Sequence, residues 1–233
     1  MKVEYVNHMG DDNSVCDAAR VSFSKQADNF TPEENNKLIN YLAKHNHWSP
    51  FAHTAITLRV QCPISIRTQV MKHQVGFNIN EESRRYISDT PELFIPEFRT
   101  KPEGSIKQGS GEVIDVLMVQ YPESLDTEAF YISYTQELLQ KEYSRLANES
   151  INFYNWLIKS GVAPEQARFI LPQGVETNFI WTGNLQSFAR FYNQRSDSHA
   201  QKEIQDLAHM VSDVIAPLYP VSWQALTGKG VNQ

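Results

Sequence analysis

Residues 54–62 read TAITLRVQC, and they carry the clearest fold signal in this chain. Apolar residues occupy the even positions from Ile56 to Val60, and polar residues occupy the odd positions between them. Successive side chains of a strand point to opposite faces, so this alternation predicts a half-buried strand. The segment VETNFIW at 175–181 alternates in the same way and predicts a second strand.

Helices are predicted on both sides of these strands. Thr31, Pro32 and Glu34 form a capping-box pattern that begins a helix ending near Lys44, with Leu38, Ile39, Tyr41 and Leu42 as its buried stripe. Pro63 ends the first strand and opens a helix over 64–73. Further helices are predicted at 127–159, 164–171, 184–195 and 198–216, the last capped by Asp197 or Ser198.

The predicted fold class is α+β, a single domain over 1–233 in which helices flank an antiparallel sheet. The strands are too far apart for a hairpin and lack a regular βαβ rhythm. The long apolar helix over 127–159 is of the kind found in bundles and at subunit interfaces. Residues 95–111 are rich in Pro, Gly, Lys and Ser, which predicts a mobile loop.

Composition limits the function classes. Lys and Arg number 21 against 27 Asp and Glu, a net charge of −6 that argues against a general nucleic-acid or membrane-surface binder. With no apolar run of membrane-spanning length and no signal-peptide pattern, a cytoplasmic protein is predicted. Cys16 and Cys62 lack CxxC spacing and are expected to be thiols, and Cys62 has no partner base nearby that would make it a nucleophile.

The densest polar cluster is KHQVGFNINEESRRY, from Lys72 to Tyr86. Its arginines, lysine and serine suit a phosphate or another planar anion, since Arg can bind one through two parallel hydrogen bonds. A solvated helix face with ordinary ion pairs is the alternative. Gly76 and the neighbouring asparagines favour a shaped loop instead.

Other clusters carry weaker signals. In RFYNQRSDSHAQKEI, residues 190–204, Arg195 lies at a predicted helix end, where a capping charge is the structural alternative. HNHWSPFAH, residues 45–53, has three histidines but no carboxylate, so no metal site is predicted, and Trp48 could face a planar cofactor or fill the core. Arg168 beside apolar residues could equally be a surface cation.

Together these clusters resemble the flavin-dependent thymidylate synthase family. The shared features are AARVSF at 18–23, HxxPF at 47–51, NEESRRY at 80–86, ARFILP at 167–172 and RSDSHAQKEI at 195–204. The chain departs from the family in one place. Where the family has Arg-His-Arg before its Ser, this chain has Lys72-His73-Gln74, eight residues and then Ser83.

The resemblance implies residues for two ligands. Those implied for FAD are Ser49, which acts from a neighbouring subunit, with Lys72, His73, Gln74, Glu81, Asn184, Gln186 and Arg190. Those implied for dUMP are Gln69, Lys72, Glu81, Glu82, Ser83, Arg84, Arg85, Arg168 and Arg195. Arg195 is the implied catalytic residue, a cation that favours charge on the pyrimidine as the ring is attacked.

The implied reaction is reductive methylation of dUMP to dTMP by a homotetramer. Reduced FAD supplies hydride, methylenetetrahydrofolate supplies carbon, and NADPH re-reduces the flavin. Two alternatives stay open at this point: a related flavin- and folate-dependent pyrimidine nucleotide hydroxymethylase, and a nucleotide-binding homologue without catalysis.

Overall fold

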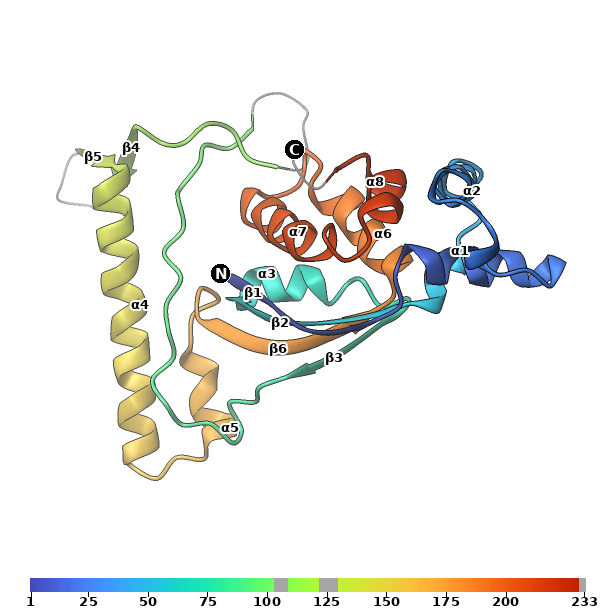
Figure 1. Ribbon diagram of the computed structural model, residues 1–233. Helices are drawn as coiled ribbons and strands as arrows, with labels where there is room; N and C mark the ends of the chain where they lie inside the picture. Colours follow the sequence, from blue (N-terminus) through green and yellow to red (C-terminus); the bar gives the residue numbers. More distant parts are fainter. Residues whose placement is uncertain (103–108, 122–129, 231–233) are drawn as a thin grey trace. The chain divides into compact units, whose positions relative to one another are not determined.

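Four strands form one sheet in the structure, a computed structural model that describes residues 1–102, 109–121 and 130–230 (Figure 1). The strand order is β1, β2, β6, β3, with β1 at Lys2–Met9, β2 at Ala55–Pro63, β6 at Glu176–Gly183 and β3 at Phe77–Glu81. β1 pairs with β2, and β3 with β6, in antiparallel register. The α+β class with an antiparallel sheet is therefore confirmed.

The chain divides into two compact units. Unit 1 comprises Met1–Cys62, Ile66–Glu82 and Thr177–Gln233, and unit 2 comprises Pro63–Ser65 and Ser83–Glu176. The assignment of 1–233 to one enzyme domain stays a prediction.

Unit 1 holds the sheet and most of the helices. They are α1 (Asp12–Arg20), α2 (Pro32–Lys44), α3 (Ile64–Val70), α6 (Leu185–Arg195), α7 (Lys202–Ile215), α8 (Pro220–Thr227) and the short 3-10 helices η1 (Val21–Phe23), η2 (Ala27–Asn29) and η3 (Ser49–His53). In Figure 1, α6, α7 and α8 cover one face of the sheet. Alternate residues of β6, from Thr177 to Gly183, are buried, as the alternation in the sequence predicts.

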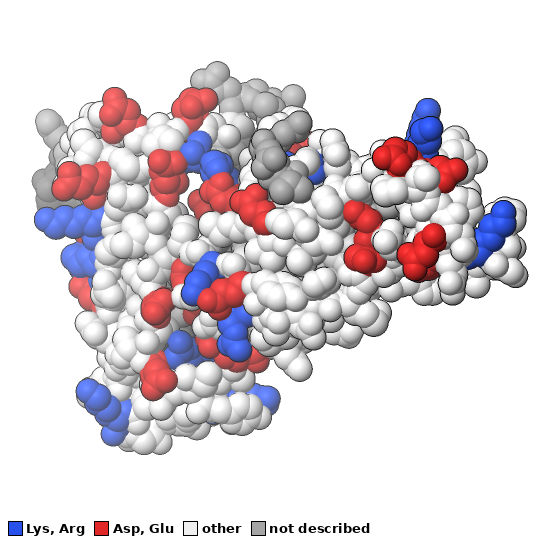
Figure 2. Space-filling model, in the orientation of Figure 1, with Lys and Arg blue, Asp and Glu red and all other residues white. Residues whose placement is uncertain are grey.

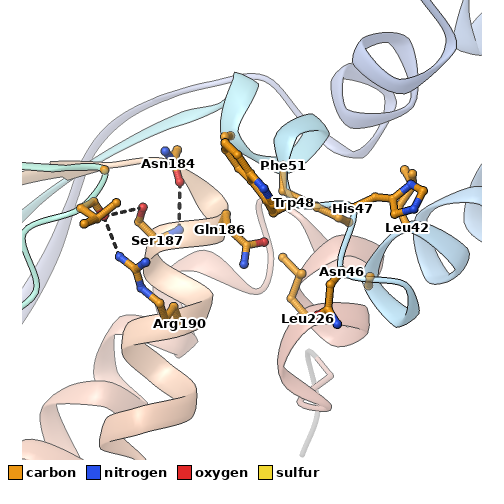
Figure 3. A pocket seen from close by; sticks show the side chains of 14 residues that line it. Leu42, Asn46, His47, Trp48, Phe51, Asn184, Gln186, Ser187, Arg190 and Leu226 are labelled. Carbon is orange, nitrogen blue, oxygen red and sulfur yellow. Dashed lines mark hydrogen bonds between the residues drawn. The ribbon is translucent and has the colours of Figure 1, made fainter. Parts of the chain in front are cut away.

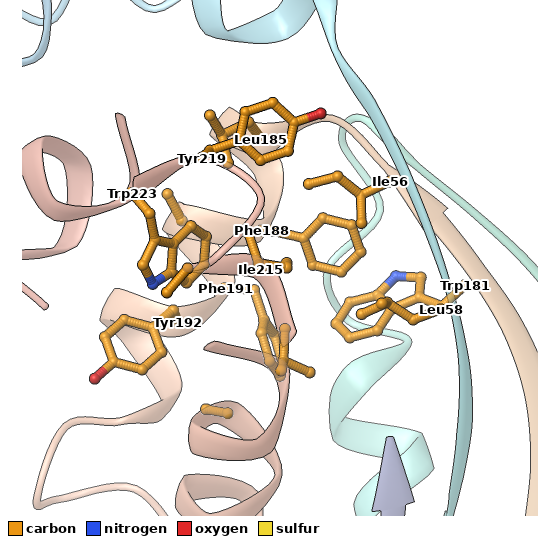
Figure 4. Close-up of a cluster of buried hydrophobic side chains, with 14 of the residues drawn as sticks. Ile56, Leu58, Trp181, Leu185, Phe188, Phe191, Tyr192, Ile215, Tyr219 and Trp223 are labelled. Carbon is orange, nitrogen blue, oxygen red and sulfur yellow. The ribbon is translucent and has the colours of Figure 1, made fainter. Parts of the chain in front are cut away.

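Aromatic side chains fill the space between the sheet and these helices (Figure 4). Trp181 of β6 is fully buried, and its ring centroid lies 4.8 Å from Phe188 and 4.9 Å from Phe191 of α6. Ile56 and Leu58 of β2 complete this layer. Such tilted and edge-on aromatic contacts fix the side of α6 that faces the sheet, which determines where its remaining residues point.

The two ends of unit 1 are joined by side-chain hydrogen bonds. Tyr219 Oη donates to the carbonyl of Met9 over 2.8 Å. The two carboxylate oxygens of Asp12 accept the backbone N–H groups of Val221 and Ser222, each over 2.9 Å. Asp12 thus caps α8 from a distant part of the sequence.

Unit 2 contains β4 (Val116–Tyr121) and β5 (Phe130–Thr135) in antiparallel register, followed by α4 (Gln136–Lys159), α5 (Pro164–Ala167) and the 3-10 helix η4 (Arg168–Ile170). The helix predicted from 127 is wrong over 130–135, where a run rich in aromatic and β-branched residues forms β5. Residues 127–129 lie outside the described residues. Of the predicted loop at 95–111, residues 103–108 also lie outside them.

The capping residues in the sequence predict the start of α2 correctly and the start of α7 wrongly. The Thr31 box is present, with the Thr31 N–H donating to Glu34 over 2.8 Å, but Tyr41 is exposed, so the buried side of α2 is narrower than predicted. Neither Asp197 nor Ser198 caps α7. The Asp197 carboxylate instead accepts the N–H of His199 over 2.8 Å, which holds a turn and delays the helix to 202.

Two boundaries near the polar cluster also differ from the prediction. The helix predicted over 64–73 ends at Val70, because the N–H of Lys72 turns back to Gln69 and that of His73 to Val70. The predicted loop over 72–86 contains β3, an edge strand whose asparagines alternate with Phe77 and Ile79. Placing polar side chains on the exposed side of an edge strand is ordinary strand patterning.

Candidate active site

A cavity of about 430 Å³ lies in unit 1 between α6 and the segment that joins α2 to η3 (Figure 3). Asn184 caps α6, accepting the N–H of Ser187 at its Oδ1 over 2.9 Å. The first turns of the helix then direct Gln186 and Arg190 toward the cavity. Three residues implied for FAD, Asn184, Gln186 and Arg190, are therefore brought together.

The loop at Val75 and Gly76 closes one side of the cavity. The carbonyl of Val75 accepts two hydrogen bonds from α6, from Ser187 Oγ over 3.0 Å and from Arg190 Nη2 over 2.8 Å. Gly76 has a φ of +79°, and a Cβ built on it would lie 2.0 Å from Ser187 Oγ. Glycine is thus required both by the left-handed backbone and by the close approach of the helix.

The lining combines an apolar surface with a few polar groups. Phe51 and Leu226 supply apolar surface, and Trp48 presents a largely exposed ring. Among the described lining residues, Arg190 is the one permanently charged side chain. Gln186 Oε1 is buried and has no hydrogen-bond partner in the described part of the chain. This donor and acceptor set fits a ligand with a flat ring, polar edges and an anionic group.

At the other end of α6, Arg195 meets His73. Arg195 Nε donates to His73 Nε2 over 2.8 Å, and the ring of His73 packs edge-on against Phe191 with centroids 5.0 Å apart. Burial, and then the charges of Arg195 and Arg190, lower the pKa of His73 to about 4. The imidazole is therefore neutral at neutral pH and accepts at Nε2, which places its proton on Nδ1.

Gln69, in helix α3, is the first of three side chains linked by hydrogen bonds, and the other two are Gln201 and Glu203. Its Nε2 donates to Gln201 Oε1 over 2.6 Å, and Gln201 Nε2 donates to Glu203 over 2.8 Å. A carboxylate can only accept hydrogen bonds, so Glu203 fixes the orientation of both amide groups. The carbonyl oxygen of Gln69 takes part in neither of these two hydrogen bonds.

The two glutamates of the cluster are held by strand β6 and helix α3. Glu81 accepts from Thr177 Oγ1 over 2.8 Å and lies 3.1 Å from Arg67 Nε. Glu82 accepts from Asn178 Nδ2 over 3.1 Å. These partners account for both carboxylates as parts of the sheet edge, and neither lines the cavity.

Besides His73 and Glu81, three more residues implied for FAD lie apart from the cavity lining. Lys72 and Gln74 are exposed in the turn that precedes β3. Ser49 is also exposed. It lines a second hollow of about 300 Å³, which His47 and Trp48 line as well.

Four residues implied for dUMP belong to unit 2. The Ser83 carbonyl accepts the N–H of Tyr86 over 2.9 Å and its Oγ accepts the N–H of Arg85 over 3.3 Å, which makes a tight turn. Arg84 donates to the Asp89 carbonyl, and Arg85 lies 5.1 Å from the centre of the Tyr86 ring. Arg168 is exposed, with its Nε donating to the Glu165 carbonyl over 3.3 Å.

Several lining residues were not singled out from the sequence. Val75, Ser187 and Leu226 come from three distant segments, and no pattern in any one segment marks them. Trp48 was singled out, and its exposed ring at the cavity shows that it does not fill the core, while its contact with a planar cofactor stays a prediction.

On the face drawn in Figure 2, Lys and Arg are interspersed with Asp and Glu. The described residues contain no group of three or more His, Cys, Asp or Glu placed to hold a metal ion. Cys62 is fully buried in β2, and neither Cys16 nor Cys62 forms a disulfide. Within 1–102, 109–121 and 130–230, no helix has the length and apolarity needed to cross a membrane.

The chain is similar to known proteins over most of its length. Residues 4–221 match the family described as thymidylate synthase complementing protein. The flavin-dependent thymidylate synthase of Kosmotoga olearia is 37% identical over 96% of this chain and 88% of its own length. That of Thermus thermophilus is 32% identical over 96% of this chain and 74% of its own.

A solved structure is also similar over the whole chain. The UMP/dUMP methylase PolB from Streptomyces cacaoi, bound with 5-Br dUMP, has a TM-score of 0.79 and 27% identity, covering 99% of this chain and 96% of PolB. Family, relatives and fold agree, and the chain belongs to the thymidylate synthase complementing protein family, the flavin-dependent thymidylate synthases.

Proposed function

We propose that this protein is a flavin-dependent thymidylate synthase that converts dUMP to dTMP. The observation that carries the proposal is helix α6, which bears the cavity residues Asn184, Gln186 and Arg190 at one end and Arg195 at the other. At 1.5 Å per residue, the helix separates Asn184 from Arg195 by about 16 Å. One rigid element thus sets the spacing between a cofactor cavity and a cation.

FAD fits the residues of the cavity. The unpartnered Gln186 Oε1 and the Asn184 amide suit the polar edges of the cofactor, and Arg190 suits an anionic group of its diphosphate. Gly76 leaves room where a side chain would intrude. Bound flavin supplies the hydride chemistry, which no protein side chain provides.

Arg195 acts on the pyrimidine by charge. A guanidinium at the ring stabilises negative charge as N3 loses its proton and the ring becomes more nucleophilic. Ser83 and Arg85 of unit 2 are proposed as phosphate ligands, because they belong to one tight turn in which Ser83 Oγ accepts the backbone N–H of Arg85 and the Arg85 side chain is exposed. Methylenetetrahydrofolate as carbon donor, NADPH as reductant, a homotetramer and a cytoplasmic location complete the proposal.

The test is a product assay with dUMP, FAD, NADPH and methylenetetrahydrofolate, read by mass. A mass increase of one methyl group is expected, whereas a hydroxymethyl increase would identify the hydroxymethylase alternative. A colourless protein that binds no flavin and yields no product would indicate a non-catalytic homologue.

UMP belongs in the same assay as a second substrate. The similarity to PolB, a UMP/dUMP methylase, is the observation that favours testing it. We expect dUMP to be preferred, since the thymidylate synthases are more similar in sequence to this chain than PolB is.

A further inference from the structure

His73 lies where it can control Arg195. Its backbone is fixed at the end of α3, since its N–H donates to the Val70 carbonyl over 3.0 Å. Its ring is buried and packs edge-on against Phe191, one turn before Arg195 on α6. The ring therefore has little freedom to move, and its Nε2 faces the Nε of Arg195 at 2.8 Å.

This contact determines which edge of the guanidinium is free. Arg binds planar partners either through Nε and one Nη or through both Nη groups. Because Nε is occupied by His73, the first mode is closed. Neither Nη group has a partner among the described residues, so the second mode is open.

We propose that the His73 side chain is a positioning residue for Arg195 in the methylation reaction. By accepting the Nε–H, it presents the two Nη groups of Arg195 to the pyrimidine. The inference rests on the proposed function and extends it, since it assigns the kept histidine of the Lys72-His73-Gln74 triplet a role that its neighbours do not share.

The acceptor role requires an unprotonated Nε2. The charged groups that act on His73 are Arg195 and Arg190, both on α6 and both cationic. A proton on Nε2 would face the Nε–H of Arg195 and add a third positive charge. Burial and these two cations keep the ring neutral, so the contact persists at neutral pH.

The experiment uses the full-length protein with FAD and compares His73→Leu, which has no acceptor, with His73→Gln, which retains one. We expect His73→Leu to lower kcat about 100-fold, the effect of a misplaced catalytic group, while KM for dUMP changes less than about threefold. The kcat of His73→Gln should be at least about tenfold higher than that of His73→Leu. Flavin content by absorbance should equal that of the wild type in both variants.

His209→Leu is the matched control. His209 also packs edge-on against an aromatic residue of α6, Tyr192, at 5.7 Å, but it does not contact Arg195. We expect its kcat to be that of the wild type. If His73→Leu fails to fold, the comparison of His73→Gln with Arg195→Lys and with the double variant replaces it, and the double variant should be no slower than Arg195→Lys alone.

The outcomes are distinct. Three results would overturn the positioning role. The first is an unchanged kcat in His73→Leu, and the second is losses of kcat that add up in the double variant. The third is a variant that has lost flavin and whose kcat returns to the wild-type value when FAD is added. A wild type that forms no dTMP contradicts the proposed function itself, and the inference with it.

Discussion

Gly76→Ala tests whether the cavity depends on the close approach of α6 to the Val75 loop. The φ of +79° at Gly76 costs an alanine about 1 to 2 kcal/mol. The new Cβ would lie 2.0 Å from Ser187 Oγ, so Ser187 must rotate and lose its hydrogen bond to Val75, a further loss of about 1 kcal/mol. The expected total is about 2 to 3 kcal/mol of unfolding free energy.

Gly228→Ala separates the two effects. Gly228 has a φ of +74°, but nothing lies within 4 Å of its Cβ position, so it should lose only the backbone contribution of about 1 to 2 kcal/mol. Urea unfolding of both variants, with flavin content matched, measures the difference. In the double variant with Ser187→Ala, the crowding is relieved and the Gly76→Ala cost should fall by about 1 kcal/mol.

Equal losses in Gly76→Ala and Gly228→Ala would refute the reasoning, because they would mean that Ser187 can move without cost. A Gly76→Ala cost that is the same with and without Ser187 Oγ would refute it as well. Weaker flavin retention should accompany the loss of stability in Gly76→Ala only, since Gly76 lines the cavity and Gly228 does not.

Three further predictions concern His73, Arg190 and Asp12. The folded pKa of His73 is about 4 against 6.5 for the free side chain, so the unfolded state binds the proton first and stability is lost as the pH falls below about 6.5. As the pH falls from 7 to 4.5, the unfolding free energy of the wild type in urea should decrease by about 2 kcal/mol more than that of His73→Gln. Equal decreases in the two proteins would contradict the low pKa of His73. Arg190→Leu should weaken FAD binding at least about tenfold, measured by fluorescence titration, through loss of the charge in the cavity, whereas Arg145→Leu on an exposed face of α4 should not; equal affinities would contradict the role of Arg190. Asp12→Ala should destabilise the protein by about 1 to 3 kcal/mol, because it leaves the N–H groups of Val221 and Ser222 without their acceptor, and Asp12→Asn should lose less; a thermal unfolding midpoint that does not change in Asp12→Ala would show that water replaces the carboxylate.

Parts of the fold that depend on neighbouring residues could be predicted from the sequence. The box at Thr31 and Glu34 and the alternation at 54–62 are each complete within one segment, and both elements formed where expected. β3 was not predicted, because its Asn78 and Asn80 occupy the exposed side of an edge strand and resemble loop residues. The hydrogen bond of the strand to β6 decides the matter, and that partner lies about a hundred residues away in the sequence.

The candidate site divides in the same way. Its residues on α6 could be assigned by resemblance, because Asn184, Gln186 and Arg190 share one helix. The contact of His73 with Arg195 could not, since 122 residues separate them and either side chain alone has an ordinary structural explanation. Lys72 and Gln74 flank His73 in the sequence, but a turn directs them to solvent while His73 is buried.

The bonds from Met9 and Asp12 to the segment 219–222 have a consequence for the order of folding. They join positions 210 residues apart, so the ribosome adds most of the chain before Met9 and Asp12 can form these hydrogen bonds. At about 5 to 20 residues per second this wait is roughly 10 to 40 s. The 83–176 segment of unit 2 emerges complete within that interval, whereas unit 1 must wait with apolar strand surface uncovered. Docking of α8 is then a late step, and nascent chains that stop before residue 219 should be those that bind chaperones.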